Sequence, residues 1–154
     1  MELALIFLPL LASITSGFFG KYLGDRNSEI VTSLFVSISA LLSIILFYQV
    51  IVNGYESNVV VATWINSGTL DVNWSIKVDA LSSVMLVVVT LVSALVHIYS
   101  IGYMSHDPHK PRFMAYLSLF TFSMLTLVTS DNFLQLFFGW EGVGLCSYFL
   151  IGFW

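Results

Sequence analysis

The residue with the clearest chemical potential in this sequence is Glu141, an acid inside the last apolar run. It lies in the glycine-flanked stretch GWEGVG (139–144) and is the only charged residue of the chain placed deep in such a run. A charged side chain at the centre of a bilayer costs about 2.5–3.5 kcal/mol on insertion scales. Acids in such places usually serve an ion pathway, a proton relay or a charged partner, so Glu141 is our candidate for proton translocation.

The helix predicted around Glu141 has two different faces. At about 100° per residue, Glu141 shares one face with Gly144, Leu145 and Tyr148. It also lies about 12 Å below the helix start, too deep for a short side chain to reach the interface easily. A purely structural interhelical hydrogen bond is the alternative role for the acid. The other face predicts close helix packing through three small residues: Gly139, Gly142 and Cys146.

Other polar residues near the apolar runs have simpler interpretations. Asp79 and Asp131 each precede a run and are predicted to cap a helix N-terminus, although Asp131 could also lie at an outer proton exit. His97 is predicted to be a satisfied interhelical or interfacial histidine, with membership of a proton relay as the alternative. His106 and His109 form a His-x-x-His loop without evident further ligands, so we expect no metal site.

The composition places these residues in a membrane protein. Hydrophobic residues make up 58% of the 154 residues and charged residues only 9%, against about 25% charged in soluble domains. The few scattered basic residues form no patch, so nucleic acid is not an expected partner. We therefore predict an all-α integral membrane protein with the lipid bilayer as its surroundings.

Five apolar runs are each close to the length of about 20 residues that a bilayer-spanning helix needs. The first run follows Glu2 without a positive segment or a convincing cleavage site, so we interpret it as a retained helix. All of the chain, 1–154, is predicted to form one membrane domain. The predicted helices span approximately residues 3–20, 30–52, 80–101, 113–129 and 133–153.

The basic residues predict an orientation. Lys21 and Arg26 lie between the first two runs, and Lys110 and Arg112 lie between the third and fourth, whereas only Lys77 lies in the alternate loops. Because basic loops stay on the inner side, this bias places the N-terminus on the outer, positive side.

The long outer segment between the second and third runs predicts a β-hairpin over about 59–78. Residues 70–79 alternate strictly between apolar and polar types, which is the period of a half-buried strand. Residues 59–65 are rich in β-branched and aromatic side chains, and 66–68 supply turn residues. We expect this outer-face hairpin to have a structural or intersubunit role.

Several stretches together resemble one known family. The run GWEGVGLCSYFLIGFW (139–154) is similar to the fifth-helix signature of chain 5 of NADH:quinone oxidoreductase, the largest antiporter-like membrane subunit of respiratory complex I. The similarity extends through VDALS (78–82), LVHIYSIGYMSHDPH (95–109), RFMAYLSLFTF (112–122) and TSDNFLQLF (129–137) to FLPLLAS (7–13).

The resemblance implies a subunit that couples quinone reduction by NADH to proton translocation, among the other membrane-arm subunits. In that family the glutamate that maps onto Glu141 pairs with a lysine on a later helix, within a fold of two inverted five-helix repeats. This sequence offers no such lysine, so we expect an N-terminal portion whose partner lysine comes from downstream sequence or another chain. Bacterial plasma membrane and mitochondrial inner membrane are both compatible locations.

The sequence predicts no cofactor in this chain, because it contains no cysteine cluster, glycine-rich dinucleotide loop or haem signature. Redox chemistry is therefore expected elsewhere in the complex. Two alternatives to the main interpretation are a subunit of a related multisubunit cation/proton antiporter and a non-catalytic membrane scaffold or truncation product.

Overall fold

The computed structural model describes all 154 residues, except the side chain of residue 70. All five helices are long and apolar enough to cross a membrane, and a two-stranded hairpin separates the second from the third, so the predicted fold class is confirmed. The elements in chain order are α1 (Glu2–Leu23), α2 (Asp25–Asn53), β1 (Ser57–Ser67), β2 (Leu70–Val78), α3 (Ala80–Tyr103), α4 (Lys110–Val128) and α5 (Phe133–Ile151).

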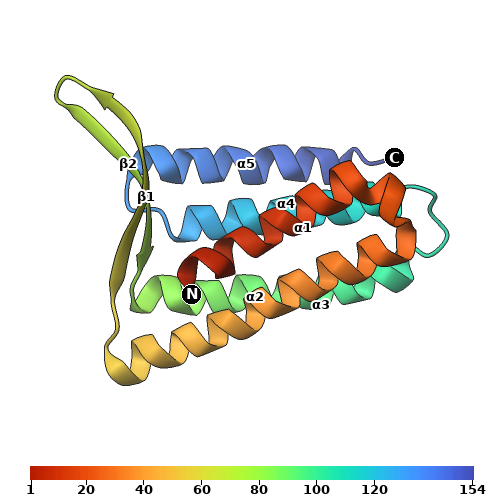
Figure 1. Cartoon of the computed structure of the whole chain (residues 1–154), viewed down its shortest axis with the longest axis horizontal. Helices are drawn as coiled ribbons and strands as arrows, with labels where there is room; N and C mark the ends of the chain where they lie inside the picture. The colour runs from red at the N-terminus through yellow and green to blue at the C-terminus, as the bar shows by residue number, and fades with distance from the viewer.

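The helices run side by side, and the hairpin crosses one end of the bundle (Figure 1). The N-terminus lies at the hairpin end, whereas the junction of α1 with α2, the α3–α4 loop and the C-terminus lie at the opposite end. Helix α4 packs against all four other helices, but α5 packs closely against α4 alone. Helix α5 is therefore the edge of the bundle.

Two helices begin earlier than their hydropathy predicts. Helix α2 starts at Asp25 rather than near residue 30, and only Gly24, with a φ of 80°, separates it from α1. Helix α4 starts at Lys110, with Pro111 in its first turn, rather than near residue 113. These polar first turns are helical because Asp25 suits the positive end of the helix dipole and proline suits the first turn. Hydropathy marks only the apolar part of each helix.

The hairpin is part of the hydrophobic core as well as its cover. Its strands pair antiparallel, with Ser57 opposite Val78, and the turn falls at 68–69, slightly later than predicted. The alternation in β2 buries Ile76 and Val78 beneath the strand. These two side chains complete a core cluster whose other buried members come from four helices: Leu5, Ile6, Leu46, Val50, Leu86 and Leu125.

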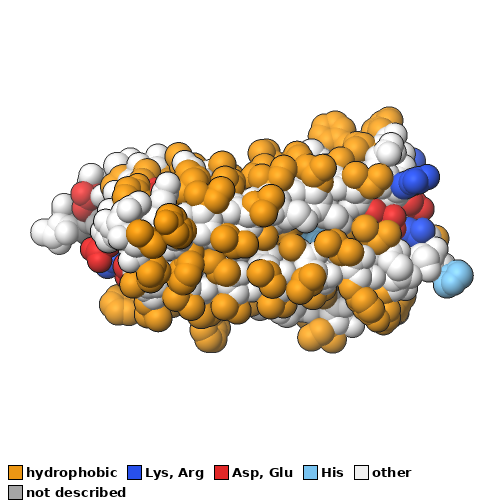
Figure 2. Space-filling view, turned by 90° about the horizontal axis from the view of Figure 1, so that it is seen from below, with side chains coloured by type: hydrophobic (Ala, Val, Ile, Leu, Met, Phe, Trp, Pro, Cys, Tyr) orange, Lys and Arg blue, Asp and Glu red, His pale blue; other side chains and the backbone are white. Residues whose placement is uncertain are grey.

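Charged side chains gather at the two ends of the bundle, and apolar side chains cover the band between them (Figure 2). The hairpin end carries Lys77 and Asp131, whose side chains approach to 3.6 Å. The opposite end carries Lys110 and Glu29, at 4.0 Å. An apolar band between charged rims is the surface that a bilayer-spanning protein presents to lipid.

Candidate functional site

Glu141 lies near the middle of α5, with its side chain exposed on the surface of the bundle. It is eight residues beyond Phe133, the first residue of the helix, which places it about 12 Å along the axis. Among the described residues it forms no salt bridge or side-chain hydrogen bond. The carboxylate therefore lies at membrane depth, as the sequence predicts, but the helices of this chain do not cover it.

The opposite side of α5 is packed tightly against α4 through its small residues. A Cβ added at Gly139 would lie 2.7 Å from Cα of Leu127, and one at Gly142 would lie 2.9 Å from Oγ of Ser123. Cys146 is buried on the same side, and its Sγ is 3.9 Å from Ser123 Oγ. The predicted division of α5 into a packing face and an acid-bearing face is thus present in the fold.

A second contact fixes α5 to the hairpin. Gln135 is fully buried in the first turn, where its Nε2 donates to Ser75 O at 2.7 Å and its Oε1 accepts from Ser75 N at 3.0 Å. Trp64 and Trp74 pack edge-on against Phe138 one turn further along. Sequence analysis missed Gln135, although a glutamine at the start of an apolar helix is a polar group that needs a partner.

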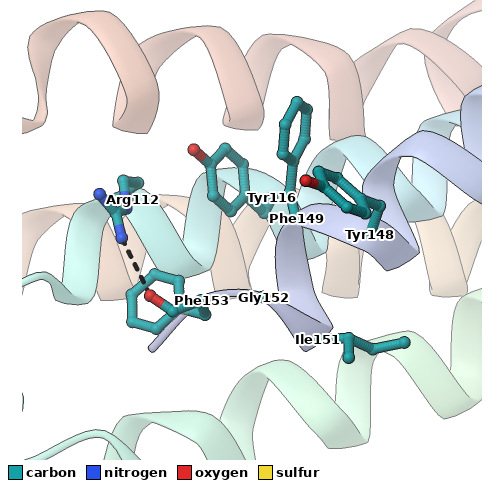
Figure 3. Close-up of a pocket in the computed structure, with 7 residues that line it drawn as sticks. All are labelled: Arg112, Tyr116, Tyr148, Phe149, Ile151, Gly152 and Phe153. Carbon is teal, nitrogen blue, oxygen red and sulfur yellow. Dashed lines mark hydrogen bonds between the residues drawn. The ribbon is translucent and has the colours of Figure 1, made fainter.

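The C-terminal end of the acid-bearing face borders a pocket of about 410 Å³ between α4 and α5 (Figure 3). Arg112 donates to the carbonyl of Phe153 at 3.3 Å and lies over its ring, next to the C-terminus of α5. Tyr116 stacks on Phe149, and Tyr148, two turns beyond Glu141, completes the lining. The pocket therefore combines a fixed positive charge with two phenol hydroxyls below the acid.

His97 lies in the interior, away from α5. Its ring is fully buried, with Nδ1 2.8 Å from Ser93 O and Nε2 3.0 Å from Ser118 Oγ on α4. A neighbouring pair joins the Ser93 and Thr121 hydroxyls across the same two helices. The prediction of a satisfied interhelical histidine is confirmed.

The two predicted caps have different outcomes. Asp79 forms a capping box with Ser82, and the Ser82 N–H that it accepts lowers the pKa of its carboxyl below the ordinary range. The Asp131 cap is wrong, because Asn132 occupies the cap position and accepts from Gln135 N. Asp131 instead accepts a hydrogen bond from Asn58 at 2.8 Å and pairs with Lys77. Aspartate and asparagine are both favourable N-cap residues, and the helix begins one residue later than predicted, so the neighbouring Asn132 is the cap.

A buried acid on α2 was missed. Glu29 falls inside α2 because the helix starts early, and its side chain is buried beside Lys110. Glu141 remains the acid at mid-helix, whereas Glu29 is the acid that the fold itself encloses, near the end of the bundle where α1 meets α2.

The α3–α4 loop holds a partly buried acid, Asp107, rather than a cluster of ligands. Asp107 accepts from Trp154 Nε1 at 2.8 Å, and this bond, with a second from His109 N, lowers the pKa of its carboxyl. Within the described residues, no three His, Cys, Asp or Glu side chains come together as a metal site would require.

These features identify the general class of this protein. Five membrane-length helices, a hairpin across one end of the bundle and a mid-helix carboxylate on the edge helix are the features of an integral membrane protein. Residues 64–114 match the family model described as "NADH-Ubiquinone oxidoreductase (complex I), chain 5 N-terminus".

Individual relatives extend the match over the whole chain. The chain is 57% identical over 154 residues to NADH-ubiquinone oxidoreductase chain 5 of Arabidopsis thaliana, covering 100% of this chain and 23% of the relative. It is 55% identical over 152 residues (99% of this chain, 23% of the relative) to chain 5 of Phytophthora infestans. Subunit L of the NADH-quinone oxidoreductase of Rickettsia conorii is 52% identical over 150 residues (97% and 23%).

The resemblance to complex I chain 5 is therefore confirmed along the whole chain. The chain spans about a quarter of the length of these relatives.

Proposed function

We propose that this chain is the N-terminal portion of a proton-translocating membrane subunit of NADH:quinone oxidoreductase. One observation carries the proposal: Glu141 lies at mid-membrane depth on the open face of the edge helix. The relatives' names support it, since each names a subunit of this oxidoreductase. Redox chemistry and its cofactors then reside in other subunits of the complex.

The position of Glu141 suits a partner that comes from outside this bundle. The other side of α5 is occupied by α4, so a helix carrying a lysine can approach only the exposed face. Such a lysine would stabilise the ionised form of the carboxylate. If the lysine moved away, the affinity of the carboxylate for a proton would rise again. We propose that downstream sequence or another chain supplies this lysine, and that further membrane-arm subunits surround it.

The arrangement of charge supports an orientation. Four of the five basic residues lie around one end of the bundle, where α1 meets α2 and α3 meets α4. We propose that this end faces the inner side and the hairpin and N-terminus face the outer, positive side. The membrane would be a bacterial plasma membrane or a mitochondrial inner membrane.

The test is Glu141→Gln in the assembled complex, with proton-motive force and NADH-driven turnover measured in sealed vesicles. Removing the ionisable group should slow proton transfer through the site by about 10²-fold or more, while the amount of assembled complex stays near normal. Glu56→Gln is the matched control, because it makes the same change in an exposed acid between α2 and β1. Unchanged pumping and turnover in Glu141→Gln would refute the role, and loss of assembled complex would favour a structural one.

A further inference from the structure

A cavity of about 480 Å³ lies at the end of the bundle that is opposite the hairpin. It is bounded by the C-terminal part of α1, the start of α2 and the first turn of α4. Its volume is within the range of about 300–1,000 Å³ that is usual for ligand pockets. Neither Glu141 nor any other residue of α5 lines it, so it is separate from the candidate site for proton translocation.

Glycines of α1 and of its junction with α2 leave the space of the cavity. Gly17, Gly20 and Gly24 all line it and contribute no side chain. A Cβ added at Gly20 would lie 2.6 Å from Cβ of Pro111, and the Ser16 hydroxyl donates to Pro111 O at 2.7 Å, so α1 and α4 touch there. No atom lies within 4 Å of a Cβ added at Gly24. The cavity is therefore closed at a fixed helix contact and open at the junction of α1 with α2.

Positive charge predominates in the lining. Lys21 and Arg112 are exposed and permanently or almost permanently charged at neutral pH, and Asp25 is the one acid among the lining residues. Among the described residues, Lys21 belongs to no salt bridge. Arg112 donates to Phe153 O, and a guanidinium has five N–H donors, so further donors are free for a ligand. The lining therefore suits an anion.

Two helix N-termini add to this positive potential. Gly24 is the N-cap of α2 and His109 is the N-cap of α4, both line the cavity, and neither helix has a side-chain cap. The positive end of a helix dipole and its free N–H groups favour phosphate and other anions. The other acids at this end, Glu29 and Asp107, have partners of their own and do not line the cavity.

The surroundings of the cavity favour a phosphate that belongs to a lipid. Charged side chains lie at this end of the bundle, and an apolar band begins next to them (Figure 2). One and two turns before Gly17, the same face of α1 carries Ile14, which is exposed, and Leu10, which is half-buried. On the other side of Arg112, the neighbouring pocket offers the rings of Tyr116 and Phe149. Acyl chains attached to a headgroup in the cavity would thus have apolar surface to follow toward the middle of the bilayer.

We propose that this cavity binds the phosphate of an anionic phospholipid, with Lys21 and Arg112 as its cationic donors. The lipid would fill the seam between α1 and α4 without any covalent step. Basic pockets between transmembrane helices bind anionic lipid headgroups in other membrane proteins. The site does not depend on proton translocation, and it requires only that this end of the bundle lies at a membrane surface.

Photo-crosslinking in the assembled complex tests the site. The complex is placed in phosphatidylcholine vesicles that contain a small fraction of photoreactive phosphatidylglycerol or, in a parallel sample, photoreactive phosphatidylcholine. With the reactive group near the glycerol backbone, phosphatidylglycerol should label residues 16–25 and 108–112 about 5-fold more than phosphatidylcholine does, because of its net negative charge. Equal labelling by the two lipids would overturn the proposal.

Lys21→Gln should lower the labelling by phosphatidylglycerol about 5-fold, because it removes one of the two cationic donors. Lys21→Arg should retain the labelling. Arg26→Gln is the matched control, since it makes the same change of charge on an exposed residue at the same end that does not line the cavity. A loss of the same size in Arg26→Gln would show attraction to the basic end as a whole and would refute a defined site.

Inorganic phosphate distinguishes the two sources of the ligand. Added in excess at constant ionic strength, it should leave the labelling nearly unchanged, because the acyl chains hold the lipid in place. Abolished labelling would show that the cavity takes free phosphate and would overturn the lipid proposal. Normal pumping in Glu141→Gln would remove the proposed function and leave this result standing, whereas unselective labelling would remove the lipid site alone.

Discussion

The interior between α2, α3 and α4 and the exposed face of α5 place their ionisable groups in opposite environments. His97 is fully enclosed and both of its ring nitrogens are paired within the chain. Glu141 lies at membrane depth on an exposed face and pairs with no described residue. The first arrangement is complete in this chain, whereas the second leaves the carboxylate without a partner among the described residues.

The two regions also differ in how they are held together. Helices α1 to α4 each pack against at least two others, and the hairpin closes their common core at one end. Helix α5 depends on one glycine-lined contact with α4 and on Gln135 at its start. As the edge helix, α5 keeps the face that carries Glu141 open, while its other face is held tightly against α4.

The largest effect is expected from Gly139→Val, which attacks the contact of α5 with α4. The new Cβ would lie 2.7 Å from Cα of Leu127, and because that neighbour is backbone, the helices must separate. Overpacking of this kind costs about 1–3 kcal/mol or more, so the yield of assembled complex should fall sharply.

Gly102→Ala, near the end of α3, is the control for that experiment, since no atom lies within 4 Å of its added Cβ. It should leave assembly unchanged and slightly favour the helix. Normal assembly of Gly139→Val would show that α5 is not held through its small-residue face. The contrast between the attachment of α5 and that of the interior helices would then be wrong.

The features set by local pattern were predictable from the sequence. The five spans and the hairpin follow from hydropathy and from two-residue alternation, and the small-residue face of α5 follows from helical periodicity. The Asp79 cap is equally local. The position of Glu141 near the middle of its helix also follows from the bounds of the apolar run.

The features set by three-dimensional contact were not predictable. Nothing local distinguishes Asn132 from Asp131 as the cap, because both types suit that position. The partner of Gln135 is the backbone of Ser75, sixty residues earlier. The exposure of Glu141 depends on which helices pack beside α5, and the sequence pattern of one helix does not specify its neighbours.

The next largest effect is expected from Gln135→Ala, which separates α5 from the hairpin. The variant leaves the N–H and the C=O of Ser75 without their buried partners, at about 1–3 kcal/mol for each unsatisfied group. Limited proteolysis of sealed vesicles should then cut the hairpin faster. Asn58→Ala is the control, because it removes an exposed bond to Asp131 and should barely change the cleavage rate.

A smaller effect with a defined pH dependence is expected at the start of α3. The Ser82 N–H lowers the pKa of Asp79 from its ordinary value of 3.8, so the charged cap stabilises the fold above that value. This contribution should disappear as the pH falls through the lowered pKa. Asp79→Asn keeps a capping side chain without the charge, so the stability difference between wild type and variant in thermal unfolding should shrink toward low pH. A difference that does not vary with pH would contradict the assignment.

The smallest effect is expected inside the bundle, from Thr90→Val. The substitution keeps the shape of the side chain and removes its bond to Ser43, whose hydroxyl retains the carbonyl of Ala40 as a partner. Interhelical hydrogen bonds in membranes average about 0.6 kcal/mol, so the thermal midpoint of the assembled complex should fall only slightly. Thr126→Val is the control, because that hydroxyl bonds only the carbonyl of Phe122 in its own helix. A loss as large as that of Gly139→Val would mean that polar pairs rather than packing hold the interior.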